Sequence, residues 1–165
     1  MFYLQKLAQP TNLAAVGGPA GLRVVLCSSM GTTNPKPPPY TGGSILFWKL
    51  NAEAFLSASG LSVAIVKPCG LMSTPGSTST LLVGKDDSLL KTMPPIVSRD
   101  DVARVMAAAL TFDARSGGNR ATDGLNQWPT DGDAPLSLRF DLCSKHGPPT
   151  SDLTALLEST KYPWQ

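Results

Sequence analysis

The sequence has few charged residues and only one histidine, and both shortages exclude classes of function. Charged residues make up 16% of the 165 residues, against about a quarter in a typical globular domain. Fourteen basic and twelve acidic side chains leave a net charge of +2, which is too balanced to indicate a protein that binds nucleic acid or a membrane surface. His146 is the one histidine, so a zinc site would lack ligands at the usual close spacing.

Cysteine is also scarce, and no long apolar run occurs. Cys27, Cys69 and Cys143 are the three cysteines, an odd number with no CxxC pair among them. Two of them lie in apolar or turn segments, so we expect reduced thiols in the cytosol or an organelle, a plastid included, and not a secreted protein. No run approaches the roughly 18 apolar residues of a membrane span, and the first residues lack the basic and apolar regions of a secretory signal.

Proline and glycine, by contrast, are abundant, with 15 residues of each. They gather at 30–43 and 72–80 and predict irregular connections there. The segment 113–135, rich in glycine and aspartate, is predicted to be a flexible loop. The hydrophobic fraction of 42% suffices for a core, so we expect one domain over residues 1–165.

Apolar runs and helical periodicity alternate along the rest of the chain. The run Val24–Cys27 ends abruptly at two serines, which is the pattern of a strand buried on both faces of a parallel sheet. Leu61–Val66 is predicted as a second strand and Leu138–Leu142 as a third. Helices are predicted near 44–59, 98–112 and 151–160. This alternation predicts an α/β fold with a parallel core and right-handed crossovers.

The first predicted helix, 44–59, is apolar on two sides, so we expect it to lie between the sheet and a partner subunit. Its stripes are Trp48, Ala52 and Phe55 on one side and Leu46, Leu50 and Ala54 on the other. Lys49 lies near the helix start, where a cation opposes the helix dipole. It also precedes Glu53 by four residues, the weaker orientation for an ion pair. A ligand would explain a lysine there, and a solvated surface lysine is the alternative.

Three glycines near the N-terminus, Gly17, Gly18 and Gly21, do not form a dinucleotide-binding fingerprint. Such a fingerprint follows a strand and opens a helix, so that the phosphate meets the helix N-terminus. These glycines instead precede the strand at Val24–Cys27, and we expect them to end a helix.

Four segments occur in an order typical of one family. They are VVLCSSMGTT, ILFWKLNAEAFLSASGLSVAIVKPCGL, LLVGKDDSLL and SRDDVARVMAAAL. These segments resemble the atypical short-chain dehydrogenase/reductase family, in particular its NmrA-like NAD(P)-binding proteins. The resemblance runs from Leu22 to Leu110 and resumes from Leu138 to Leu157. It implies a Rossmann-like parallel sheet with flanking helices, NADP or NAD as the cofactor, and an unknown small-molecule substrate.

Members of that family begin with a Gly-rich βαβ unit that holds the pyrophosphate, and nothing in this sequence matches it. The resemblance therefore implies a partial Rossmann-like sheet in which the N-terminal βαβ half is missing, as in a truncated member. Such a sheet leaves the edge beside Val24–Cys27 unpaired, which favours self-association. Cofactor binding would be weak or lost, because the contacts with the phosphates would be absent.

The resemblance carries over only a few site residues. Ser28 and Ser29 match the serines at the end of the family's central strand, beside the nicotinamide side of the cofactor. Lys49 matches the lysine of the Tyr-x-x-x-Lys motif, which hydrogen-bonds the nicotinamide ribose. The tyrosine position holds Ile45, which cannot donate or accept a proton, so the usual catalytic acid is missing.

A turn after the second predicted strand belongs to the same implied site. Pro68, Cys69, Gly70 and Leu71 match the turn whose backbone cups the nicotinamide in relatives. An ordinary strand exit is the alternative interpretation of these residues.

The sequence leaves several functions open. The first is an NAD(P)-binding protein of oxidoreductase type, active or degenerate. The second is a non-catalytic interaction or redox-sensing module with the same fold, which the absent tyrosine favours over an active reductase. The third is a hydrolase using Ser28 or Ser29, which is disfavoured because His146 follows the last strand and no G-x-S-x-G elbow exists.

Overall fold

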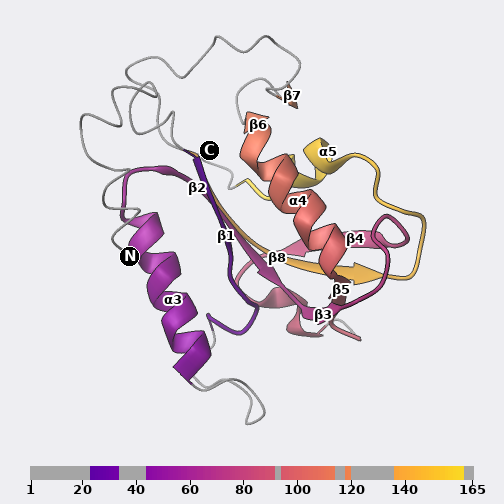
Figure 1. The fold of residues 1–165 in the computed structure, drawn as a ribbon, viewed down its shortest axis with the longest axis horizontal. Helices are drawn as coiled ribbons and strands as arrows, with labels where there is room; N and C mark the ends of the chain where they lie inside the picture. The colour runs from indigo at the N-terminus through magenta and orange to yellow at the C-terminus, as the bar shows by residue number, and fades with distance from the viewer. Residues whose placement is uncertain (1–22, 34–43, 92–93, 114–117, 120–135, 162–165) are drawn as a thin grey trace.

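The computed structural model describes residues 23–33, 44–91, 94–113, 118–119 and 136–161. In chain order the elements are β1 (Arg23–Cys27), α3 (Ser44–Ser57), β2 (Ser62–Pro68), β3 (Gly70–Met72), β4 (Thr80–Gly84), η1 (Ser88–Lys91), β5 (Ile96–Ser98), α4 (Arg99–Thr111), β6 (Phe112–Asp113), β7 (Gly118–Asn119), β8 (Ser137–Lys145) and α5 (Leu153–Glu158). Helix α3 lies on one face of the main sheet, and α4 and α5 lie on the other (Figure 1). This is the α/β fold that the sequence predicts.

The main sheet has the strand order β1-β2-β8-β4. β1 pairs with β2 in parallel, from Arg23↔Ser62 to Cys27↔Val66, and β2 pairs with β8 in parallel. The predicted parallel core is therefore confirmed. β4 joins the far side of β8 in the antiparallel sense, so β1 and β4 are the outer strands of the sheet that the described residues form. Two small sheets, β3–β5 and β6–β7, complete the described strands.

The two faces of the sheet are packed differently. The face toward α4 and α5 buries a large apolar cluster. Its almost fully buried members include Val66, Val105, Phe112, Phe140 and Leu157. The face toward α3 buries a much smaller cluster of Leu56, Leu61 and Val63. Because hydrophobic stabilisation grows with the apolar area that is buried, most of it comes from the side of α4.

Helix α4 forms where its sequence predicts, and polar groups satisfy both of its ends. The Ser98 hydroxyl accepts a hydrogen bond from the backbone N–H of Asp101 at 2.9 Å, which confirms the N-cap. Asp100 and Asp101 place negative charge in the first turn, where the helix dipole favours it. At the other end, the Arg23 guanidinium donates to the carbonyl of Leu110 at 3.3 Å.

The cysteines differ from expectation. The structure joins Cys69 and Cys143 in a disulfide, with their Cα atoms 5.2 Å apart. Both residues are buried, whereas Cys27 is free and exposed. The expectation of reduced thiols is therefore wrong for this pair. The paired residues are 74 positions apart, so only the tertiary fold brings them together.

Some predictions concern residues outside the ranges that the structure describes. Most of the predicted loop at 113–135, and Gly17 to Gly21, lie outside the described residues. The single-domain prediction for residues 1–165 therefore stays a prediction. Within the described part of the chain, no helix has the length and apolar character needed to cross a bilayer.

Candidate cofactor site

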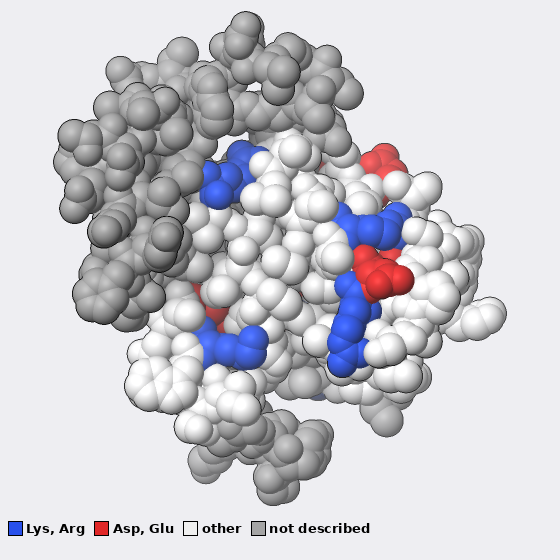
Figure 2. All heavy atoms as spheres, in the orientation of Figure 1, with Lys and Arg blue, Asp and Glu red and all other residues white. Residues whose placement is uncertain are grey.

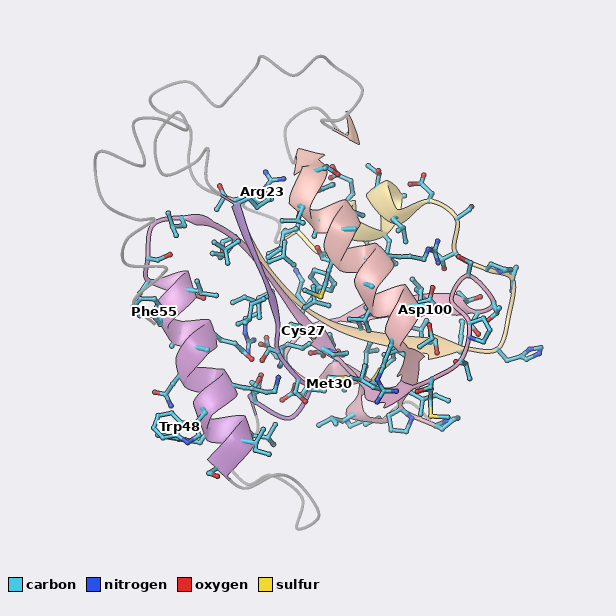
Figure 3. The ribbon with its side chains drawn as sticks, in the orientation of Figure 1. Arg23, Cys27, Met30, Trp48, Phe55 and Asp100 are labelled. Atoms are coloured by element: carbon cyan, nitrogen blue, oxygen red, sulfur yellow. A yellow bond between two sulfur atoms is a disulfide. The ribbon has the colours of Figure 1, made fainter. Side chains whose placement is uncertain are left out.

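A cavity of about 330 Å³ opens between the C-terminal end of β1 and the first half of α3. It is lined by Leu26, Cys27, Ser28, Ile45, Trp48, Lys49 and Ala52. Figure 3 places Cys27 at the end of β1 and Trp48 on α3. Ligands of open α/β sheets bind at the carboxyl ends of the strands, and this cavity lies at such an end. Three residues that the family resemblance singles out, Ser28, Lys49 and Ile45, meet around it.

Lys49 is half-buried, and its ammonium group lies against the end of β1. Its Nζ donates to the carbonyl of Cys27 at 3.3 Å and to that of Ser28 at 3.1 Å. Lys49 is therefore neither a freely solvated surface lysine nor an ion-pair partner of Glu53. A lysine ammonium carries three N–H donors, and among the described residues two carbonyls accept from this one.

The two serines after β1 have different surroundings. Ser28 is buried, lines the cavity and donates its hydroxyl hydrogen to Glu53 Oε1. Ser29 is half-buried, donates to the carbonyl of Met30 at 3.0 Å, and does not line the cavity. Both hydroxyls are bound to oxygen acceptors and neither to His146, so the hydrolase alternative gains no support.

The turn Pro68–Leu71 lies beside the loop after β1 but not on the cavity wall. The carbonyl of Pro68 accepts a hydrogen bond from the Met30 N–H at 3.1 Å. Cys69 and Gly70 donate their N–H groups to Leu142 and Pro95 at 2.9 and 2.8 Å. The structure thus brings this turn next to the site through Met30, while its own amides are used within the fold.

Glu53 is a residue of this site that sequence reasoning missed. It is buried on α3 and accepts hydrogen bonds from Ser28 and, at 2.8 Å, from Thr32. Its other oxygen lies 2.9 Å from Arg139 Nε. One carboxylate therefore ties α3 to the loop after β1 and to the central strand β8.

A second group of charges lies beneath the same loop and was also missed. The Lys67 side chain is fully buried, with Nζ 2.5 Å from Asp87 and 3.4 Å from Asp141. Asp87 also accepts hydrogen bonds from the backbone N–H groups of Gly31 and Thr33, both at 2.9 Å. Gly31 has a φ of +93°, which glycine adopts more readily than any other residue. Asp87 thus fixes the shape of the loop that carries Ser28.

The two carboxyl groups beside Lys67 have opposite pKa shifts. Burial alone would raise the pKa of Asp87, but hydrogen bonds from Lys67, Gly31 and Thr33 hold it below its usual value of 3.8. Burial raises the pKa of Asp141 above 3.8; Lys67 opposes this rise and the charge of Asp87 adds to it. We call Lys67, Asp87 and Asp141 the ionic layer. It lies beneath the loop that carries Ser28, and its total charge depends on pH.

One signal in the sequence could have indicated this layer. Lys67 directly follows the predicted strand Leu61–Val66 and Asp141 lies within the predicted strand Leu138–Leu142, and in the sheet they are direct register partners on β2 and β8. A lysine and an aspartate buried in neighbouring strands are costly unless they pair. The pairing could have been inferred from this cost once the strands were placed side by side.

Comparison with known proteins identifies the family. A family model described as NAD(P)H-binding matches residues 13–113. The chain belongs to the NAD(P)H-binding family. This confirms the resemblance to atypical short-chain dehydrogenases/reductases, and the matched range contains all the predicted site residues, from Ser28 to Leu71.

Curated relatives of this NAD(P)H-binding chain share 38% identity with it. An uncharacterized chloroplastic protein of Arabidopsis thaliana matches over 109 residues, which is 65% of this chain and 34% of that protein. Sanguinarine reductase of Eschscholzia californica matches over 92 residues, 54% of this chain and 34% of the reductase. An uncharacterized sugar epimerase of Bacillus subtilis matches over 86 residues, with shares of 52% and 34%. The chain therefore spans about a third of the length of these relatives.

Solved structures show the same fold. A protein of Bacillus halodurans assigned as an NAD-dependent epimerase/dehydratase superposes with a TM-score of 0.56 at 21% identity, over 82% of this chain and 50% of its own. An oxidoreductase of Lactococcus lactis gives a TM-score of 0.51 at 14% identity, over 84% and 53%. At these identities the likeness supports the Rossmann-like architecture alone.

Proposed function

We propose that this chain binds the nicotinamide–ribose end of NADP or NAD at the cavity between β1 and α3. Ser28 and Lys49, which line the cavity, would form that end of the site, and Ser29 and the turn Pro68–Leu71, which lie beside it, would complete it. The observation that carries the proposal is the placement of Lys49, whose ammonium group lies at the strand end beside the cavity and would donate its third N–H to a ribose hydroxyl. The cavity of about 330 Å³ is at the lower limit for ligand pockets, which suits one end of a dinucleotide and not the whole.

Reductase chemistry is not part of this proposal. The side chain of Ile45 lines the cavity at the position where the family has its tyrosine, and it cannot transfer a proton. The protein is then a degenerate NAD(P)H-binding member of the oxidoreductase type, and its substrate, if it has one, is a small molecule that the site does not identify. The chloroplastic Arabidopsis relative supports a plastid as its compartment.

A non-catalytic interaction or redox-sensing module is the second candidate. The disulfide between Cys69 and Cys143 favours it, because Cys69 belongs to the turn beside the site. Oxidation and reduction of this pair would change the constraint on that turn. Self-association through the edge of β1 belongs to the same proposal.

Titration calorimetry with NADPH tests the binding proposal. The sequence contains no G-x-x-G-x-x-G motif of the kind that holds the pyrophosphate, and each charge-assisted hydrogen bond lost costs about 1.5–3 kcal/mol. We therefore expect a dissociation constant of roughly 1 mM or weaker, and no reduction of added carbonyl substrates.

The matched variants are Lys49→Ala and Lys145→Ala. Lys145 is an exposed lysine at the end of β8, away from the cavity. Lys49→Ala should abolish the residual binding and Lys145→Ala should leave it unchanged. Equal losses in both variants would show that the binding is non-specific attraction to positive charge. Micromolar affinity in the wild type would mean that the phosphates have a site of their own.

A further inference from the structure

Three buried sulfur atoms meet beside the loop that carries Ser28. Met30 Sδ lies 3.0 Å from Cys69 Sγ and 3.6 Å from Cys143 Sγ. Met30 and Cys69 are each 7% exposed, and Cys143 is fully buried. The three residues come from the loop after β1, the turn after β2 and the strand β8, and Figure 3 shows Met30 near the end of β1. The disulfide between Cys69 and Cys143 is therefore packed directly against the loop.

The main chain around the disulfide is held independently of it. The Cys69 N–H donates to the carbonyl of Leu142 at 2.9 Å, next to the register pair Pro68↔Leu142 of β2 and β8. Cys143 pairs with Leu82 of β4 in the same sheet. These hydrogen bonds do not involve the sulfur atoms, so the two Cα atoms, 5.2 Å apart, keep their places when the disulfide is broken. A change of redox state is therefore confined to side chains.

Reduction of the pair has to displace a neighbouring side chain. Two thiols need more room than one disulfide, because their sulfur atoms are no longer bonded and each gains a hydrogen. Protein interiors are close-packed, so the two sulfur atoms can separate only at the expense of a neighbour. Met30 touches both of them, and the unbranched side chain of methionine adapts its shape easily. We therefore expect Met30 to be the neighbour that moves.

A displacement of Met30 reaches the cofactor cavity within two residues. The Met30 N–H donates to the carbonyl of Pro68 at 3.1 Å, and the Ser28 N–H donates to that of Val66 at 2.8 Å. These two bonds align the loop with the end of β2. Because Ser28 lines the cavity, a shift at Met30 weakens the bond to Pro68 and disturbs one wall of the cavity.

We propose that Cys69 and Cys143 form a redox switch, which sets the conformation of residues 28–33 through Met30 and so regulates the candidate cofactor site. The oxidised pair holds the loop as the structure shows it. The reduced pair displaces Met30, loosens the loop and weakens the binding of the nicotinamide–ribose end of NADP or NAD. The effect on binding rests on the proposed function, whereas the response of the loop does not.

The switch operates by thiol–disulfide exchange with an external dithiol. A thiolate of the dithiol attacks Cys69 Sγ, since Cys69 is 7% exposed and Cys143 is 0% exposed. Cys143 leaves as a thiolate and takes up a proton that the dithiol has lost. The second thiolate of the dithiol then attacks the dithiol's own sulfur in the mixed disulfide and releases Cys69, which takes up the second proton. This chain gains two thiols and the reductant becomes a disulfide.

Hydrogen exchange followed by mass spectrometry, on the full chain without NADPH, tests the response of the loop. Charged groups lie in separate places on the face shown in Figure 2, with uncharged surface between them, so a small neutral dithiol, dithiothreitol, serves as the reductant. Reduction should speed the exchange of the amides in residues 28–33 by about tenfold, an ordinary size for coupling between sites. Thermal unfolding that stays cooperative verifies that the reduced chain is folded.

Met30→Ala and Met106→Ala separate the sulfur contact from the general loss of stability on reduction. Met30→Ala leaves room for the two thiols, so reduction should no longer speed the exchange in residues 28–33. Met106→Ala is the matched control, because Met106 packs against the same apolar cluster from α4, and there the effect of reduction should persist. Equal exchange in the two redox states of the wild type, or an equal effect of reduction in the two variants, would overturn the proposal.

Binding of NADPH to the oxidised and the reduced wild type is a second measurement that needs no variant. Titrations followed by NMR, which suit weak ligands, should give an affinity several-fold higher for the oxidised chain. Equal affinity in the two states would overturn the regulation of the site and leave the proposed function standing. A loop that responds through Met30 in a chain that binds no NADPH in either state would contradict the proposed function and leave the switch standing.

Discussion

Helices α3 and α4 cover opposite faces of one sheet, and different forces hold them there. α4 packs Val102, Val105 and Ala109 into the large apolar cluster and presents charge to water in its first turn. α3 buries only Leu56 and Glu53. Its attachment to the sheet depends on directional polar bonds, through Glu53 to Arg139 and through Lys49 to the carbonyls of β1.

This difference shows which face of the sheet is the more fully packed among the described residues. On the side of α4, the helix buries its apolar residues in the large cluster, and Ser98 caps its N-terminus. On the side of α3, four large apolar residues (Ile45, Phe47, Trp48 and Leu50) are exposed while Glu53 is buried, which is unusual for a surface helix. The candidate site lies on this side.

The largest expected effect contrasts an aromatic residue from each side. Phe112 is 1% exposed in the cluster beneath α4 and Trp48 is 67% exposed on α3. Phe112→Ala should lower the free energy of unfolding by about 3–5 kcal/mol, because it leaves a cavity. Trp48→Ala should change it by less than about 0.5 kcal/mol. Urea denaturation of the two variants and the wild type measures both changes, and equal losses would contradict the contrast between the two sides.

The disulfide should give an effect of similar or slightly smaller size. Cys69 and Cys143 both belong to the cluster on the side of α4. Closing a loop of 74 residues stabilises a folded chain by about 4 kcal/mol in the chain-entropy model. Thermal unfolding with and without a thiol reductant, in a Cys27→Ser background, should show this loss. Thiol labelling of the native oxidised wild type should modify Cys27 alone, and modification of all the cysteines would contradict the pairing.

The smallest effect concerns the ionic layer on the side of α3. The raised pKa of Asp141 contributes stability that is complete below 3.8 and is lost as the pH rises through the folded value. The lowered pKa of Asp87 acts in the opposite sense: its contribution is present above 3.8 and is lost as the pH falls through its folded value. Asp141→Asn removes the contribution of Asp141 and retains that of Asp87.

Asp141→Asn should therefore raise the melting temperature at pH 7 relative to the wild type. The advantage should shrink toward zero as the pH falls below 3.8, where Asp141 is protonated in both folded and unfolded chains. The measurement is a series of melting curves against pH. An advantage that does not depend on pH would show that Asp141 is not the group that titrates.

The order of the main strands and helices was predictable because apolar runs, helical spacing and helix caps are patterns within short segments of the sequence. The run Val24–Cys27, the Ser98 cap and the apolar spacing of α4 each occupy one segment, and the structure contains all of them. The placement of Lys49 near a cavity followed from family resemblance, but its bonds to the carbonyls of β1 did not. These depend on how α3 is packed, which no local pattern specifies.

The contacts that were not predicted all join distant segments. Lys67 meets Asp87 and Asp141 only because β2 and β8 become neighbours and the loop after β4 folds back over them. The disulfide between Cys69 and Cys143 depends on the same neighbourhood. Glu53 was considered as a helix partner of Lys49, yet its carboxylate reaches Arg139 instead. Spacing along one helix cannot reveal a partner on another strand.

The exposed apolar residues of α3 also bear on how long the protein survives in a cell. The folded chain presents Ile45, Phe47 and Trp48 together, which is the kind of apolar surface that chaperones and proteases act on. Replacing them by polar residues should accordingly lengthen the lifetime of the chain in a cell while changing its free energy of unfolding very little.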